Sequence, residues 1–187
     1  MRRFAFLLTL GGLFGAANMW AQSPPTSHTG PGAAHARTPD LLDRLVGRWQ
    51  VVGQVHGRPA TYAADGHRVL SGRFVELDMT DISSPPAYEA RVFIGEDTTA
   101  TKVLVHWLDN FGAAYSVPAA SGRIVGDTIR FEFAYSSGPF RDTFVYHRAN
   151  GGWTFRLEAG DGSGGWRPFA DYEVRRSKKA GGRAPAH

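Results

Sequence analysis

The 187-residue chain contains no cysteine. This absence excludes disulfide bonds, thiolate catalysis and cysteine-ligated metal sites together. The fold must therefore be held by an apolar core alone, which a mature chain of about 166 residues is long enough to build.

Long apolar runs are missing as well. Phe4 to Ala17 is apolar over roughly fourteen residues, fewer than the ~20 that cross a bilayer as a helix. It follows Arg2-Arg3 and precedes Met19 to Ala21, and this order of basic, apolar and small-residue regions is typical of a secretory signal. We expect residues 1–21 to be a signal peptide cleaved before Gln22, and the protein to be periplasmic or secreted and not an integral membrane protein. An uncleaved interfacial anchor is the alternative.

Positive charge is scarce over most of the chain, although its pI is about 9.7. From Gln22 to Val174, 14 Lys and Arg stand against 17 Asp and Glu, so this part carries a net charge of about −3. The chain therefore offers no basic face for nucleic acid. The basic residues gather instead at the C-terminus, where we expect residues 177–187 to form a solvated, disordered tail. Contact of this tail with anionic lipid is the alternative.

Helical periodicity is also rare. Residues 22–37 are rich in Pro, Ser, Thr, Gly and Ala, which is typical of a disordered spacer. Thr38 to Asp40 has the residue types of a helix start, and Leu41 to Leu45 then provides an apolar stripe that ends at Gly47. We expect one short N-terminal helix that covers one end of the domain. No segment of twelve residues after Arg48 keeps a helical period.

Strand-forming residues are abundant after Arg48. The clearest case is 128–135, where Ile, Phe, Phe and Tyr alternate with Thr, Arg, Glu and Ala. Gly126-Asp127 and Asn150-Gly151 are typical of hairpin turns. The pattern predicts about ten strands, near 48–56, 67–80, 87–95, 101–109, 112–118, 122–125, 128–136, 141–148, 153–160 and 166–176.

Short antiparallel strands linked in order leave two exposed edges unless the sheet closes on itself. We therefore predict an all-β domain over 38–176, an up-and-down antiparallel barrel whose interior can hold one small ligand. An open β-sandwich is the alternative.

Five short motifs occur along this domain in a fixed order. They are a Leu-x-Gly-x-Trp, a Gly-Arg-Phe, a Gly-x-Asp turn, a Trp-x-Asp followed by Gly, and an aromatic strand that ends in Arg. In this order and spacing the chain resembles a bacterial family of lipocalin-like (calycin) barrels, and the resemblance implies the barrel fold without implying an activity. The motifs are at Leu45 to Trp49, Gly72 to Phe74, Gly95 to Asp97, Trp107 to Gly112 and Tyr172 to Arg176.

The resemblance also implies a structural role for two residues. In lipocalins the Trp of the first strand packs at the closed end of the barrel against an Arg of the last strand. Here this implies barrel closure by Trp49 with Arg175 or Arg176. A guanidinium stacked on an indole contributes roughly 0.5–2 kcal/mol.

The seven histidines do not form a metal-binding pattern. His106 and His147 are in predicted strands, but their more apolar neighbours claim the inner face, so both are expected on the solvent side. Nitrobindins, haem-binding barrels of related shape, use a His near the last strands. The segment 153–176 contains none, so this feature does not carry over. We expect neither a metal nor another cofactor.

Carboxylates inside a barrel could carry out acid–base chemistry. Glu76 and Asp78 alternate with Val75, Leu77 and Met79, which favours Glu76 and Asp78 facing water. A buried Glu76 beside an interior Tyr and Arg is the alternative. Asp97 and Asp109 are expected to cap backbone donors in turns.

Strand parity predicts which residues line the barrel interior, while Arg130, Glu132, Arg156 and Glu158 are expected to face water. The predicted ligand-binding residues are Val92, Val105, Trp107, Phe131, Phe133, Phe144, Tyr146 and Phe155.

Three functions are compatible with such a domain. The first is an exported, non-enzymatic barrel that binds a small apolar or amphipathic molecule. The second is a cofactor-free barrel enzyme of decarboxylase or cyclase type, which an interior carboxylate beside an apolar wall would favour. The third is a structural barrel packed solid, which the lack of a cavity above about 300 Å³ would favour.

Overall fold

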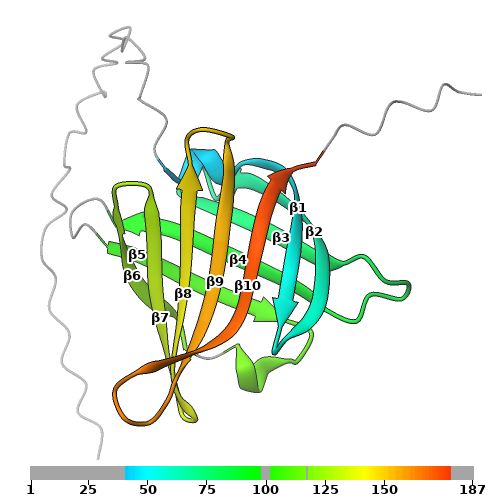
Figure 1. The fold of residues 1–187 in the computed structure, drawn as a ribbon. Coiled ribbons are helices and arrows are strands. Elements are labelled where there is room, and N and C mark those ends of the chain that lie inside the picture. Colours follow the sequence, from blue (N-terminus) through cyan, green and yellow to red (C-terminus); the bar gives the residue numbers. More distant parts are fainter. Residues whose placement is uncertain (1–40, 98–101, 117, 178–187) are drawn as a thin grey trace, which may run out of the picture. The chain divides into compact units, whose positions relative to one another are not determined.

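The computed structural model describes residues 41–97, 102–116 and 118–177. In this part of the chain, ten antiparallel strands form one closed up-and-down barrel (Figure 1). Each strand pairs with its neighbours in sequence, and β1 pairs with β10. The prediction of a closed all-β barrel is confirmed, and the open sandwich is wrong. The strands are β1 (Gly47–Val55), β2 (Arg58–Val69), β3 (Phe74–Asp81), β4 (Glu89–Asp97), β5 (Lys102–Asp109), β6 (Ala120–Val125), β7 (Thr128–Tyr135), β8 (Gly138–His147), β9 (Gly152–Gly160) and β10 (Trp166–Arg176).

Several predicted segments lie outside the part of the chain that the structure describes. They are the signal peptide, the spacer, the helix start at 38–40 and the tail from residue 178 onward. Among the residues that the structure describes, no helix is long and apolar enough to cross a membrane.

Two predicted strands are wrong, and the two errors cancel in the strand count. The predicted strand 67–80 is two strands, β2 and β3, and β2 already begins at Arg58. β2 carries Pro59, three alanines and Asp65, residue types with low strand propensity. The predicted strand 112–118 is wrong because this segment contains the 3₁₀ helix η2 (Ala113–Tyr115).

The missed strand β2 begins at a two-residue hairpin turn. His56 and Gly57 join β1 to β2 with φ angles of 48° and 75°. Positive φ at both central residues is the type I′ pattern, whose twist matches that of the flanking strands. The predicted turn at Gly126-Asp127 is confirmed between β6 and β7.

The predicted N-terminal helix is a single 3₁₀ turn, η1 (Leu42–Leu45). Val46 is already extended and Gly47 starts β1, so the helix cannot continue beyond Leu45. Leu42 and Leu45 are buried in the core, which confirms that this segment covers a barrel end. We call this the capped end, and the end that carries the β5–β6 connection the far end (Figure 1).

Alternation of apolar and polar residues fixes which side of each strand faces inward. In β7, Ile129, Phe131 and Phe133 are buried, whereas Arg130 and Glu132 are exposed. Because side chains point to opposite faces with a period of two, one strand with unambiguous alternation sets the inward parity of its paired neighbours.

The barrel has one short seam. β5 and β6 pair over only three residue pairs, from Val103↔Gly122 to Val105↔Ala120. β1 and β2, in contrast, pair over their full lengths, from Gly47↔Gly66 to Val55↔Arg58. The second half of β5 therefore has no partner strand on its β6 side, next to the segment that holds η2.

Candidate functional site

The predicted ligand-binding residues share the barrel interior. Seven of them, all except Tyr146, are in the buried core. Aromatic rings follow one another along this wall: Phe144 stacks on Phe155 at 3.9 Å between ring centroids, and Phe155 is 6.2 Å from Trp107. Phe131 lies 6.2 Å from Phe144. Such ring pairs stabilise a wall beyond their area burial and hold its shape.

Tyr146 lies at the capped end, away from the centre of the wall. Its ring is 5.0 Å from that of Trp153, and the Arg44 guanidinium donates a hydrogen bond of 3.2 Å to its hydroxyl. Arg44 belongs to η1, so Tyr146 joins this turn to β8. Its contacts are those of a structural residue, although it also packs against the core.

At the capped end, Trp49 packs against Arg176. The Arg176 guanidinium lies 3.9 Å from the Trp49 ring centroid and donates a 2.7 Å hydrogen bond to the Val46 carbonyl. The Trp49 indole N–H donates to the Leu45 carbonyl at 2.7 Å. Arg175 as the partner is wrong: it points to solvent and pairs with Glu173, because neighbouring strand residues face opposite sides.

The Gly of the Gly-x-Trp motif has a specific role at this closure. Gly47 has φ 124°, and a β-carbon there would overlap the Arg176 guanidinium. A side chain at this position would therefore both strain the backbone and displace the cation from the Trp49 ring.

The interior between η1 and the Trp107–Phe155 ring pair is almost filled by its own side chains. The cavity there has a volume of about 30 Å³, enough for no more than a few water molecules. Its lining residues, all apolar, include Leu45, Trp49, Met79, Trp107 and Phe155. No drug-sized ligand fits into this cavity without rearrangement, because ligand pockets are typically 300 Å³ or larger.

A carboxylate that the sequence analysis missed lies in the same interior. Asp142 of β8 is 1 % exposed, and its Oδ1 atom has no hydrogen-bond partner. It stands between Phe131 of β7 and Leu157 of β9 on the inner face. Its place two residues before Phe144 gives it the parity of an inward-facing residue, and this was the available signal.

Burial governs the electrostatics around Asp142. It raises the pKa of the Asp142 carboxyl well above its ordinary value of 3.8. Burial also raises the pKa of Tyr135 to about 12, and the nearby Asp142 and Asp109 add to this shift. Tyr172 has a raised pKa from burial and from hydrogen bonding with Tyr62. The interior therefore favours neutral, protonated side chains.

A hydrogen-bonded chain occupies the far end. The Trp107 indole N–H donates to the Tyr88 hydroxyl at 3.0 Å, and this hydroxyl donates to Asp109 Oδ2 at 3.4 Å. Asp109 Oδ1 accepts the Phe111 N–H at 3.1 Å, which confirms its predicted role in a turn. Burial raises the pKa of Asp109, while the hydrogen bonds from Phe111 and Tyr88 oppose the shift.

Next to this hydrogen-bonded series, two aromatic side chains are exposed at the surface. Phe111 and Tyr115 are 64 % and 62 % exposed. Phe111 lies 5.5 Å from the Tyr88 ring and 6.3 Å from Tyr115. Exposed apolar groups in a connected series often mark binding surfaces.

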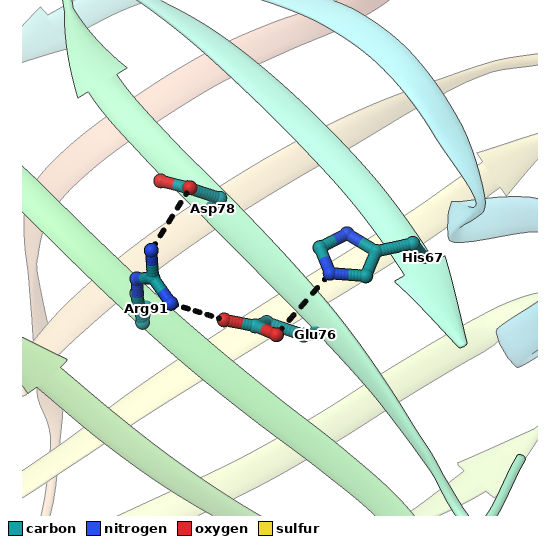
Figure 2. Close-up of polar contacts among 4 residues, drawn as sticks. All are labelled: His67, Glu76, Asp78 and Arg91. Atoms are coloured by element: carbon teal, nitrogen blue, oxygen red, sulfur yellow. Dashed lines mark hydrogen bonds and ion pairs between the residues drawn. The ribbon is translucent and has the colours of Figure 1, made fainter. Parts of the chain in front are cut away.

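The predicted carboxylates Glu76 and Asp78 lie on the outside of the barrel (Figure 2). Full solvation of Glu76 is wrong: its side chain is only 9 % exposed, because His67 lies 3.2 Å from Oε2 and Arg91 lies 3.2 Å from Oε1. Arg91 also approaches Asp78 at 3.7 Å. The alternative of a buried Glu76 beside an interior Tyr and Arg is wrong as well, because the cluster is on the outer face.

Metal-binding groups were sought throughout the described ranges. No group of three or more His, Asp or Glu side chains in these ranges could hold a metal ion. His106 and His147 are exposed, as predicted.

Comparison with known proteins identifies no family. No family model matches the chain, and no curated protein matches it. Among solved structures, the chain is similar to Rv2717c from M. tuberculosis, with 12 % sequence identity and a TM-score of 0.49. The match covers 73 % of this chain and 95 % of that one.

Proposed function

We propose that the protein is an exported barrel that binds a small apolar or amphipathic molecule beside Asp142, in the half of the interior nearer the far end. The observation that carries this proposal is the unpartnered Oδ1 of Asp142 in an aromatic wall. An unsatisfied buried polar atom costs roughly 1–3 kcal/mol, so such groups are rare without a role. A bound molecule with one polar group would satisfy it.

We propose that the ligand enters at the far end. The exposed rings of Phe111 and Tyr115 lead to Tyr88, which contacts Trp107 inside the barrel. The short β5–β6 seam lies beside this path. The capped end is closed by η1, Trp49 and Arg176, so a ligand has no comparable way in there.

The 30 Å³ cavity favours a different candidate, the structural barrel packed solid. Asp142 counts against that candidate, because an apolar residue of similar size would pack there without the cost of an orphaned oxygen. Asp142 is also an interior carboxyl beside an apolar wall, the feature that would favour a cofactor-free barrel enzyme. In that candidate, protonated Asp142 would donate a proton to the bound substrate.

Uptake of an apolar dye tests the binding function. The wild-type protein should bind N-phenyl-1-naphthylamine, which is uncharged, and quench the fluorescence of Trp107. Phe133→Arg should abolish uptake, because Phe133 is 2 % exposed and its replacement puts a charge into the interior. The measurement is dye titration by fluorescence, with Trp107→Phe assigning the quenched residue.

Arg130→Ala is the matched control, since Arg130 is the exposed neighbour of Phe131 on β7. It should bind dye like the wild type. Near-ultraviolet circular dichroism must show that Phe133→Arg is folded. Equal uptake by Phe133→Arg and Arg130→Ala, or none by the wild type, would favour the packed structural barrel.

Export has its own test. The mature protein should begin at or near Gln22, because a signal peptidase cleaves after small residues such as Ala21. The intact mass of the protein recovered from the periplasm or medium measures this directly. A mass that retains Met1 would contradict the proposed processing.

A further inference from the structure

Asp142 lacks a positive partner. None of the ion pairs among the described residues includes it, and its immediate cross-strand neighbours on the inner face, Phe131 and Leu157, are apolar. The nearest arginine in sequence, Arg141, faces outward and pairs with Glu158 at 2.7 Å while stacking on Trp166. The protein thus provides a buried acid without the cation that would stabilise its ionised form.

Aromatic residues are neighbours of Asp142 on the inner face of the barrel. Phe131 pairs directly with Asp142, and Phe144 is the next inward-facing residue of β8. Phe155 stacks on Phe144, and Tyr172 lies 5.8 Å from Phe155. Ring faces attract cations, by about 2 kcal/mol or more where water is excluded. A carboxyl group combined with aromatic faces is the chemistry that recognises an organic ammonium ion.

We infer that the ligand of the barrel is a small aromatic or aliphatic amine, whose ammonium group pairs with Asp142 while its apolar part packs against Phe131 and Leu157, the inner-face neighbours of Asp142. This inference rests on the proposed binding function and adds the chemical class of the ligand. A neutral amphipathic molecule that donates one hydrogen bond to Asp142 is the competing outcome of the test.

Binding of an ammonium ion has a defined proton balance. Burial raises the pKa of the Asp142 carboxyl, which favours its protonated form in the unliganded barrel. When R–NH₃⁺ binds, the Asp142 O–H bond breaks, the carboxylate remains paired with the ammonium group, and one proton leaves to solvent. Below the pKa of Asp142, amine affinity therefore rises about tenfold per pH unit, whereas the affinity of a neutral ligand does not.

Other titrating groups in the interior do not share this behaviour. The titratable side chains that face the region from neighbouring elements are Tyr135 of β7, Tyr172 of β10, Tyr62 of β2, Tyr88 before β4 and Asp109 of β5. Tyr88, Tyr135 and Tyr172 have raised pKa values and keep their protons near neutral pH. Burial raises the pKa of Asp109 as well, but both of its carboxyl oxygens already accept hydrogen bonds, from Tyr88 and from the Phe111 N–H, so it is not an unpartnered acid.

Three ring-matched probes test the inference: 2-phenylethylamine, 2-phenylethanol and 3-phenylpropionate. Their affinities are measured by calorimetry between pH 5 and 8, in buffers of different ionisation enthalpy so that proton release is counted. We expect the amine to bind at least about tenfold more tightly than the alcohol near pH 7, with release of protons on binding. The carboxylate should bind weakest.

Asp142→Asn is the decisive variant because it keeps the shape of the side chain and removes its acidity. It should bind the amine no more tightly than the alcohol, with no proton release, while alcohol affinity stays within about threefold of wild type. Equal affinities of the amine and the alcohol in the wild type, or an amine preference that survives in Asp142→Asn, would overturn the inference. If the naphthylamine dye binds but the amine does not, only this inference fails; if the dye fails too, the binding function fails with it.

Discussion

Trp49→Ala should lower the free energy of unfolding by about 3–5 kcal/mol. Trp49 is 2 % exposed, lines the small interior cavity and donates a hydrogen bond to the Leu45 carbonyl. Its removal enlarges that cavity, leaves the Leu45 carbonyl without its partner and deprives the Arg176 guanidinium of the ring that it covers. Thermal and urea unfolding without ligand measure the loss.

Two arginine variants distinguish the stabilising contact of Arg176 with Trp49 from the general effect of removing a positive charge. Arg176→Ala should destabilise the barrel by roughly 1–2 kcal/mol, because it removes the ring contact and the hydrogen bond to Val46. Arg175→Ala should be nearly neutral, since Arg175 is exposed and its pair with Glu173 is a surface pair. A Trp49→Ala protein that melts like the wild type would refute the closure argument.

Asp142→Asn should stabilise the unliganded protein at neutral pH, by an amount that depends on pH. The folded-state pKa of Asp142 is raised, so between the unfolded pKa near 3.9 and the folded value the native state binds more protons than the unfolded state. Wild-type stability therefore falls as pH rises through this window, by roughly 1.4 kcal/mol per pH unit from this group. Below pH 4 the wild type and Asp142→Asn should have similar stability, and above the folded pKa their difference should be constant.

Melting curves of both proteins from pH 4 to 9 measure this difference. Asp161→Asn serves as a control of opposite sign, because hydrogen bonds from the Ser163 backbone and side chain lower the pKa of Asp161. That variant should lose stability relative to wild type above the unfolded pKa. A pH-independent difference between wild type and Asp142→Asn would show that Asp142 is ionised and stabilised in the folded protein.

The sequence predicted the fold well where side-chain alternation was unambiguous. Phe131 and Phe133 face inward because every second residue of β7 is large and apolar, and this parity extends to the strands paired with it. It failed at 58–69, where Pro59, the alanines and Asp65 conceal a strand that is held by pairing on both sides and not by its own propensity. It also failed at Ala113 to Tyr115, where short apolar and aromatic residues form a 3₁₀ turn at the barrel end.

The site was harder to predict than the fold. Carboxylates are almost never buried without a partner, so the residue type argues against an interior position for Asp142, although its parity with Phe144 places it inside. For Glu76 the predicted side of the strand is right, but the predicted exposure to water is wrong. Its outward parity was read correctly, but parity alone could not reveal that His67 and Arg91 cover it from neighbouring strands. The choice between Arg175 and Arg176 depended on the register of β10 against β1, which no local pattern determines.

Among the ten strands, β1 with β10 is the one pairing between strands that are distant in sequence. Trp49 lies opposite Arg176, so the ring of strands closes only when the last strand pairs with the first. Closing so long a loop has an entropic cost before any contact compensates for it. Until this pairing forms, β1 and β10 are open strand edges, which can pair with other chains and cause aggregation.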